Sequence, residues 1–61
     1  MNYQIIYAEG DTIYAAALSL EHKVRNYIKL GWEPLGGISV SKDTYSHTLM
    51  YTLMQAMIIR Q

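Results

Sequence analysis

The chain has 61 residues, no cysteine, and five basic residues that balance five acidic ones. This length allows a single domain, residues 1–61, and a domain of this size buries only about 60% of the surface that its unfolded chain exposes. The lack of cysteine excludes disulfides and thiolate metal sites, and His22 and His47 have no nearby carboxylate pattern that predicts a metal site. We therefore expect no metal and no cofactor, and we expect self-association to supply the missing stability.

The neutral charge and the hydropathy pattern also bear on the partners. A chain of zero net charge without a basic stripe does not predict binding to duplex nucleic acid. No apolar run reaches the ~20 residues that span a bilayer, and Met1 is followed by polar Asn2 and not by a signal peptide. The sequence thus predicts a soluble, cytoplasmic protein without membrane contact.

The first half of the chain predicts a strand followed by a helix. Residues 2–8, NYQIIYA, are aromatic and β-branched as in strands, and residues 9–11, EGD, are typical of a turn. Residues 12–30 then place apolar side chains three, four or seven positions apart, which indicates one face of an amphipathic helix. These side chains are Ile13, Ala17, Leu20, Val24, Tyr27 and Ile28.

The start of this helix has two interpretations. Asp11 can cap a long helix, because its carboxylate can accept hydrogen bonds from the free amides of the first turn. Alternatively, Ser19 caps a short helix and residues 12–18 pair with the first strand. Three consecutive alanines, residues 15–17, favour the long helix.

The second half predicts two further strands. Residues 36–41 alternate apolar and polar side chains, Lys42 and Asp43 form a turn, and from Thr44 the chain runs as one long strand or two collinear ones. From Leu49 onward both sides of this strand are apolar. One helix can cover only one side of the sheet, so we expect the other side to pack against a second copy; the alternative is a monomer with an exposed apolar face. The predicted fold class is α+β: a β-α-β-β domain with an antiparallel sheet and one amphipathic helix, assembled as a homodimer or higher oligomer.

The segment GWEPLGG, residues 31–37, predicts the return from helix to sheet. Gly31 ends the helix because glycine adopts the left-handed conformation without a Cβ clash. Trp32 can cover the base of the helix, and Pro34 directs the chain into an extended conformation. Gly36 and Gly37 then open the strand, mark a bulge, or allow the close approach of a ligand.

This segment also carries a resemblance. The matching positions are Gly31, Trp32, Pro34, Gly36, Gly37, Ile38 and Val40, and then Gln55, Ala56, Met57, Ile58, Ile59 and Arg60. With the preceding helix they resemble a family of very small bacterial and phage proteins of unknown function, although residues 9–18 look longer than is usual there. The resemblance implies an α+β oligomer without catalytic residues, in the cytoplasm of a bacterial host cell. By analogy it implies an anti-defence sponge, one of the small phage proteins that sequester nucleotide messengers of bacterial immunity.

The sequence contains no pattern that predicts catalysis. It has no phosphate-binding loop, no Ser-His-Asp arrangement and no HExxH motif, and its five acidic residues lie at turns or on the solvated helix face. We therefore expect that the protein is not an enzyme.

A binding site is easier to assemble from the residues present. Residues 44–48, TYSHT, gather hydroxyls, a phenol and an imidazole, and strand alternation places Tyr45, His47 and Tyr51 on one face. Aromatic rings stack on nucleobases, and an arginine binds phosphate in a bidentate manner. The candidate ligand-binding residues are Trp32, Tyr45, His47, Tyr51 and Arg60. Each also has a structural interpretation: an exposed histidine, tyrosines that pack at an interface, and a solvated arginine.

Two hypotheses of function follow. In the first, the protein is a non-enzymatic homo-oligomer that sequesters a small anionic, nucleotide-like ligand at its subunit interfaces. In the second, it is a protein–protein interaction module that docks on a host or phage protein and modulates it.

Overall fold

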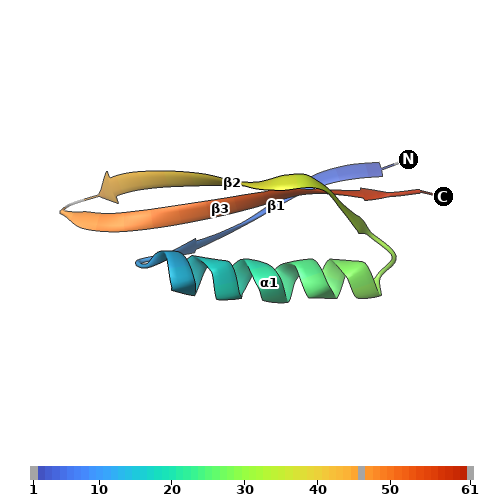
Figure 1. Cartoon of the computed structure of the whole chain (residues 1–61), viewed down its shortest axis with the longest axis horizontal. Coiled ribbons are helices and arrows are strands. Elements are labelled where there is room, and N and C mark those ends of the chain that lie inside the picture. The colour runs from blue at the N-terminus through green and yellow to red at the C-terminus, as the bar shows by residue number, and fades with distance from the viewer. Residues whose placement is uncertain (1, 46, 61) are drawn as a thin grey trace.

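The fold consists of one helix packed on a three-stranded antiparallel sheet (Figure 1). The computed structural model describes residues 2–45 and 47–60. The elements follow the order β1 (Asn2–Gly10), α1 (Ile13–Lys29), β2 (Glu33–Tyr45) and β3 (Thr48–Ile59). The predicted β-α-β-β order and the α+β class are confirmed.

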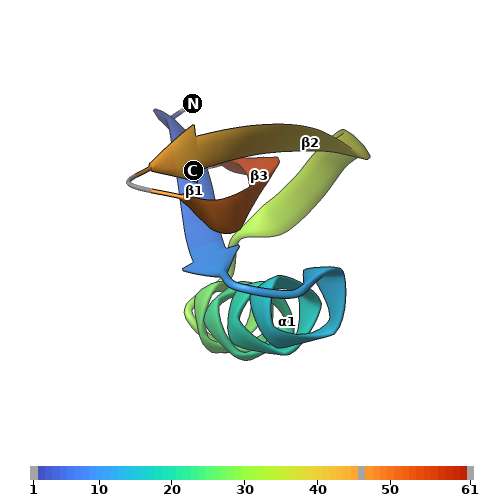
Figure 2. The ribbon, with the colours of Figure 1, turned by 90° about the vertical axis from the view of Figure 1, so that its left-hand side faces the viewer.

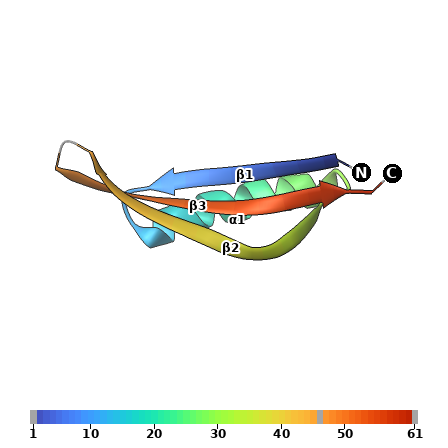
Figure 3. The same cartoon turned by 90° about the horizontal axis from the view of Figure 1, so that it is seen from above.

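Strand β3 is the centre of the sheet, with β1 on one side and β2 on the other (Figure 3). Its register with β1 runs without interruption from the pair Asn2–Ile59 to the pair Gly10–Tyr51. The β2–β3 hairpin is longer than predicted, because its ladder continues to the pair Tyr45–Thr48. The predicted turn at Lys42 and Asp43 is therefore wrong, since both residues are paired within the ladder, and a two-residue connection closes the hairpin instead.

Helix α1 has the long form that the alanines favour, so the short alternative capped by Ser19 is wrong. The capping residue is Thr12 and not Asp11: Thr12 has an extended backbone, and its hydroxyl accepts a hydrogen bond from the Ala15 amide at 3.1 Å. An N-cap side chain has to lie two or three residues before the amide that it satisfies. Asp11 comes one residue too early for this amide. The turn predicted at residues 9–11 is wrong for Glu9 and Gly10, because both residues belong to β1 and pair with β3.

The return from helix to sheet is shorter than predicted. Gly31 has a φ of 98°, and the amides of Leu30, Gly31 and Trp32 bond back to the last helical carbonyls, so the predicted stop at Gly31 is confirmed. Strand β2 then begins at Glu33 and includes Pro34, which an edge strand tolerates. The β2–β3 register shifts between Leu35 and Ser39, where Gly36 has a φ of 75°; of the predicted roles for this glycine, the structure shows the bulge.

The core lies between α1 and the side of the sheet that faces it (Figure 2). Even-numbered residues of β1 and odd-numbered residues of β3 point to this side, because their pairing register keeps partners on one face. The buried cluster comprises Ile6, Ala8, Ala16, Leu20, Leu53 and Met57, with Val24, Tyr27, Trp32 and Tyr51 packed against it.

The opposite side of the sheet has no helix over it. We call this surface the open sheet face; its members are Tyr3, Ile5, Tyr7, Leu35, Met54 and Ala56. The three β1 side chains and Leu35 are each about half exposed or more. On the last strand, however, Met54 and Ala56 are only partly exposed, and Ile58, which the register places on the same side, is buried. The described part of the chain thus leaves this side of the strand only partly uncovered, and its burial by a second copy stays a prediction.

The molecule is slender, with extents of 45 × 16 × 16 Å. Its radius of gyration is 12.7 Å, whereas a globular domain of this length has about 10 Å. Its accessible surface is 4549 Å², whereas a monomeric protein of 7.0 kDa exposes about 4000 Å². The chain thus exposes about 500 Å² more than its mass predicts.

Candidate functional site

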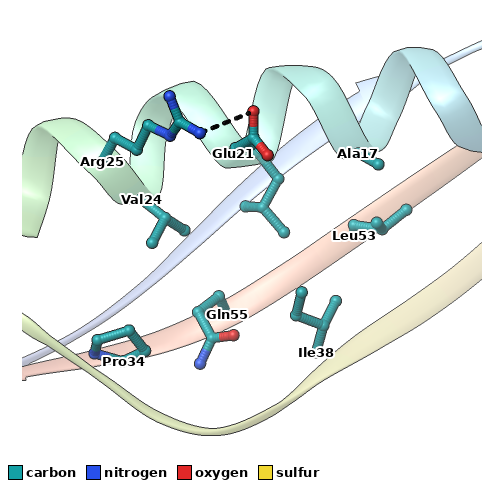
Figure 4. Close-up of a pocket in the computed structure, with 9 residues that line it drawn as sticks. Ala17, Glu21, Val24, Arg25, Pro34, Ile38, Leu53 and Gln55 are labelled. Atoms are coloured by element: carbon teal, nitrogen blue, oxygen red, sulfur yellow. Dashed lines mark ion pairs between the residues drawn. The ribbon is translucent and has the colours of Figure 1, made fainter.

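A groove with a volume of about 440 Å³ runs between α1 and β2, and β3 forms its floor (Figure 4). Its walls are mostly apolar. The lining residues are Ala17, Leu20, Glu21, Val24, Arg25, Pro34, Ile38, Leu53 and Gln55. This volume lies within the range of ligand-binding pockets in proteins.

The groove exists because the helix is not centred under the sheet. Helix α1 packs mainly against β1 and β3, and β2 bows away from it at the register shift (Figures 2 and 3). Ile38 and Val40 lie on the part of β2 that faces the helix side of the sheet. Because α1 does not reach them, 58% and 59% of their surface stays exposed. The glycine-containing bulge thus creates the space that the groove occupies.

Gln55 supplies a polar group at the floor of this groove. Only 5% of its surface is exposed, and its Nε2 donates to three main-chain carbonyl groups. The acceptors are Leu35 at 3.3 Å, Gly36 at 3.2 Å and Ala56 at 3.0 Å. The amide nitrogen carries two hydrogens, so at least one of them is shared between two of these carbonyls, and the three acceptors together orient the nitrogen toward β2.

The amide oxygen of Gln55 consequently points into the groove (Figure 4). No hydrogen bond of the described residues uses this Oε1, and every fully buried side-chain nitrogen or oxygen among those residues has a partner. The Oε1 is therefore an acceptor that the floor of the groove offers to a ligand, whereas the charged side chains that line the groove, Glu21 and Arg25, lie at its rim.

Glu21 and Arg25 form the rim of the groove on the helix side. Their charged groups are 3.6 Å apart, with side-chain exposures of 53% and 68%. Such an exposed pair one helical turn apart contributes little to stability. Its effect on the groove is that the two charges cancel, so the rim presents no net charge to a ligand.

A second, shallower pocket of about 340 Å³ lies where α1 meets the edge strand β1. We call it the edge pocket; Gln4, Ile5, Ile6, Tyr7, Lys23 and Tyr27 line it. The Lys23 Nζ donates to the Tyr7 carbonyl at 2.6 Å and lies 5.3 Å from the centre of the Tyr7 ring. The Gln4 amide donates to the Tyr27 hydroxyl at 2.8 Å. In this pocket a cation and two phenols lie close together.

The five residues proposed from the sequence lie at different ends of the molecule. Trp32 and Arg60 belong to the end that carries the C-terminal end of α1 and the end of β3, whereas Tyr45 and His47 belong to the tip of the hairpin at the far end (Figure 1). Tyr51 lies between them and packs against the core. One copy of the chain therefore does not bring the five together.

The predicted common face of Tyr45, His47 and Tyr51 is wrong, because the last strand begins at Thr48 and not at Thr44. Tyr45 is the last residue of β2, and His47 has a left-handed backbone with a φ of 67° in the hairpin connection. Strand alternation does not relate residues that a turn separates. Ser46, which belongs to the same TYSHT motif, and the side chain of Tyr45 lie outside what the structure describes.

Trp32 has the structural role predicted for it. Its ring meets the Tyr27 ring edge to face, with centroids 5.7 Å apart, and packs against the buried cluster at the base of the helix. Arg60 follows β3 directly and is exposed.

Gln55 was not among the candidate residues, although the sequence contains a signal for it. It is the polar member of the inward row Leu53, Gln55 and Met57, and a polar side chain in such a row has to find partners or serve a ligand. The three carbonyls that fix it come from the bulge and from its own neighbour, and a bulge of this form cannot be derived from the strand pattern.

Within the described ranges, no three histidine, aspartate or glutamate side chains converge as they would at a metal site. No helix among these residues is both long enough and apolar enough to cross a bilayer. The chain matches none of the family models, curated proteins or solved structures with which it was compared. The resemblance to the small bacterial and phage family accordingly stays a prediction.

Proposed function

We propose that this protein is a non-enzymatic protein-interaction module whose groove binds an apolar side chain that carries one hydrogen-bond donor. The observation that supports it most directly is the Gln55 Oε1, held toward the groove by the three carbonyls that bind its amide nitrogen. The apolar walls supply affinity without chemical selectivity, and the oxygen supplies the selectivity.

The acceptor determines which side chain fits best. Filling the groove removes water from the Oε1, and a buried acceptor left without a donor costs about 1–3 kcal/mol. A phenylalanine ring imposes this penalty, whereas the indole N–H of tryptophan or the hydroxyl of tyrosine avoids it. The preferred anchor is therefore a tryptophan or a tyrosine.

The surroundings of the groove suit a segment of protein better than a free small molecule. Ile28 at the helix end and Val40 on β2 extend the exposed apolar surface beyond the residues that line the groove. A specific protein contact buries roughly 800 Å² on each partner, which is more than the groove alone provides. A partner segment that inserts one aromatic anchor and covers these neighbours would meet that requirement.

A titration with two matched probes tests the proposal. N-acetyl-L-tyrosinamide and N-acetyl-L-phenylalaninamide differ only in the donor hydroxyl, and their binding can be followed from the Gln55 side-chain amide signals in ¹⁵N NMR spectra. The cost of about 1–3 kcal/mol for an acceptor left without a donor predicts a preference of roughly 5- to 150-fold for the tyrosine probe. Equal affinities would contradict the proposal, and so would the absence of any shift of the Gln55 signals with either probe in a folded protein whose groove is vacant.

Two matched variants serve as controls for this titration. Ala17→Phe adds a ring inside the groove and should abolish binding, whereas Ser19→Phe adds the same ring on an exposed part of α1 that does not line the groove. Loss of binding in both variants would point to a general effect of the added ring.

A nucleotide-like ligand remains a second candidate, and the edge pocket favours it. Lys23 there offers a positive charge beside the rings of Tyr7 and Tyr27, the combination that holds a phosphate and stacks on a base. The five residues predicted from the sequence would serve such a ligand only if several copies contributed them. A melting-temperature shift of several degrees with a linear or cyclic nucleotide, lost in Lys23→Met, would favour this candidate over the first.

A further inference from the structure

We infer that Tyr14 of a second copy of the chain occupies the groove and donates its hydroxyl to the Gln55 Oε1. The inference rests on the proposed function in that it uses the same groove, and it names the partner as another copy of the protein. Because the groove and Tyr14 belong to the same chain, two copies can exchange this contact symmetrically.

Tyr14 has the properties that the groove requires. Among the large apolar side chains of the described residues, that of Tyr14 is the most exposed, at 80%. Its hydroxyl takes part in none of the hydrogen bonds of those residues. An aromatic ring that ends in one donor matches a groove with apolar walls and one acceptor.

Tyr14 also lies on the correct flank of the helix. The positions 14, 17 and 21 follow one another at steps of three and four, and Ala17 and Glu21 line the groove. If two helices lie side by side and antiparallel, each Tyr14 faces the groove of the partner subunit. Leu18, one turn from Tyr14 and 59% exposed, then lies next to the two-fold axis and packs on Leu18 of the partner subunit.

The charges select the antiparallel arrangement. A parallel pair would place Glu21 against Glu21 of the partner subunit, and Arg25 against Arg25 of the partner subunit. In the antiparallel pair centred on Leu18, Arg25 instead lies opposite Asp11 of the partner subunit, just before the start of its helix. The antiparallel pair therefore brings together opposite charges where the parallel pair brings together like ones.

The exposed area agrees with one such contact. The chain exposes about 500 Å² more than a monomer of its mass, and the smaller specific interfaces bury roughly 600 Å² on each partner. Covering the groove and the flank with Tyr14 and Leu18 would remove an area of this order.

The dissociation constant of the dimer, measured by sedimentation equilibrium, tests the inference. Wild type should sediment at twice 7.0 kDa at micromolar concentration. Tyr14→Phe should weaken the dimer by roughly 30-fold or more, because the hydrogen bonds of both symmetric contacts are lost, and Tyr14→Ala by on the order of 1000-fold, because both aromatic anchors are lost. Tyr3→Phe makes the same change on the open sheet face and should have no effect on the dissociation constant.

A double variant tests whether the two side chains contact each other. Gln55→Met combined with Tyr14→Phe should lower the free energy of dimer formation by less than the sum of the two single changes.

Cysteine crosslinking tests the arrangement, and the chain is suited to it because it has no native cysteine. Leu18→Cys should form a disulfide between the two chains under mild oxidation, because Leu18 lies next to the two-fold axis and Tyr14 stays in place to hold the dimer. Folded wild type that stays a monomer, or a dimer that tolerates Tyr14→Ala, would overturn the inference.

The same variant separates this inference from the proposed function. In Tyr14→Ala the groove is vacant, so N-acetyl-L-tyrosinamide should bind more tightly than it does to wild type. If Tyr14→Ala binds the probe but wild type is monomeric, only the inference fails. If Tyr14→Ala is folded and does not bind the probe, the proposed function fails as well.

Discussion

Gly10 is the residue at which strand β1 and helix α1 come closest. A Cβ atom at this position would lie 2.5 Å from the Ala16 nitrogen and 3.0 Å from the Ala15 carbonyl carbon. Both are main-chain atoms of the first helical turns, so neither can move without shifting the helix. The absence of a side chain at Gly10 therefore allows Ala16, which is fully buried, to reach the sheet.

We expect Gly10→Ala to destabilise the protein by about 2 kcal/mol, as overpacking of a close contact does. For a domain of this size the melting temperature should fall by roughly 10 °C. Gly37→Ala is the matched control: nothing lies within 4 Å of its added Cβ, so its melting temperature should change little. Similar losses in both variants, measured by circular dichroism, would show that the close contact at Gly10 is not the cause, because the lower flexibility of the unfolded alanine chain by itself stabilises the fold.

At the scale of the elements, the start of α1 depends on one side chain. The Thr12 hydroxyl accepts the Ala15 amide, and the first helical turn contains no acidic residue that could take over. The Thr12 carbonyl meanwhile accepts the Ala16 amide at 3.1 Å. Thr12 therefore satisfies two of the helix's first amides.

Thr12→Ala removes the hydroxyl and keeps the carbonyl. We expect a loss of about 1 kcal/mol of unfolding free energy, the usual effect of deleting an N-cap side chain. Thr12→Ser restores the acceptor and should recover most of that stability in the same chemical denaturation experiment. If serine performs no better than alanine, the capping hydrogen bond does not hold the helix start.

The elements differ in how far the sequence could predict them. The helix and its stop at Gly31 follow from apolar spacing and from the left-handed preference of glycine, both of which are local signals. The hairpin turn is not local: Lys42 and Asp43 look like a turn, yet they are paired because the ladder extends to Tyr45 and Thr48. Register and hairpin length depend on partner strands, and these are decided by the whole sheet.

The candidate site was predictable only in part for the same reason. The apolar side chains of α1 and the polar Gln55 are visible in the sequence, but the groove arises from the bulge after Leu35 and the off-centre helix. The five residues that the sequence predicts for a binding site share a suitable chemistry but not a location, because they are spread along the 45 Å length of the molecule.

At the scale of the whole molecule, two exposed apolar surfaces are alternative sites for the predicted contact with a second copy. The sequence predicts self-association through the open sheet face, whereas the groove and Tyr14 lie on the helix side of the sheet. Met54, in the middle of the open sheet face, reports on the first surface alone.

Met54→Asp places a charge at the centre of the open sheet face. If the copies meet through Tyr14 and the groove, we expect this variant to keep its native mass in light scattering, with a melting temperature within a few degrees of wild type. A shift to monomer in Met54→Asp, with Tyr14→Ala unaffected, would assign the contact to the open sheet face instead.

The slim outline of the molecule has a consequence for its solubility. The open sheet face and the groove side of α1 lie on different sides of the molecule. Copies joined through both surfaces would form open chains that grow without limit, because no ring or shell closes them. Conditions or substitutions that allow both surfaces to bind other copies at once should produce fibres, which can be detected as turbidity. Selection for solubility would therefore limit the apolar character of the surface that the dimer leaves exposed.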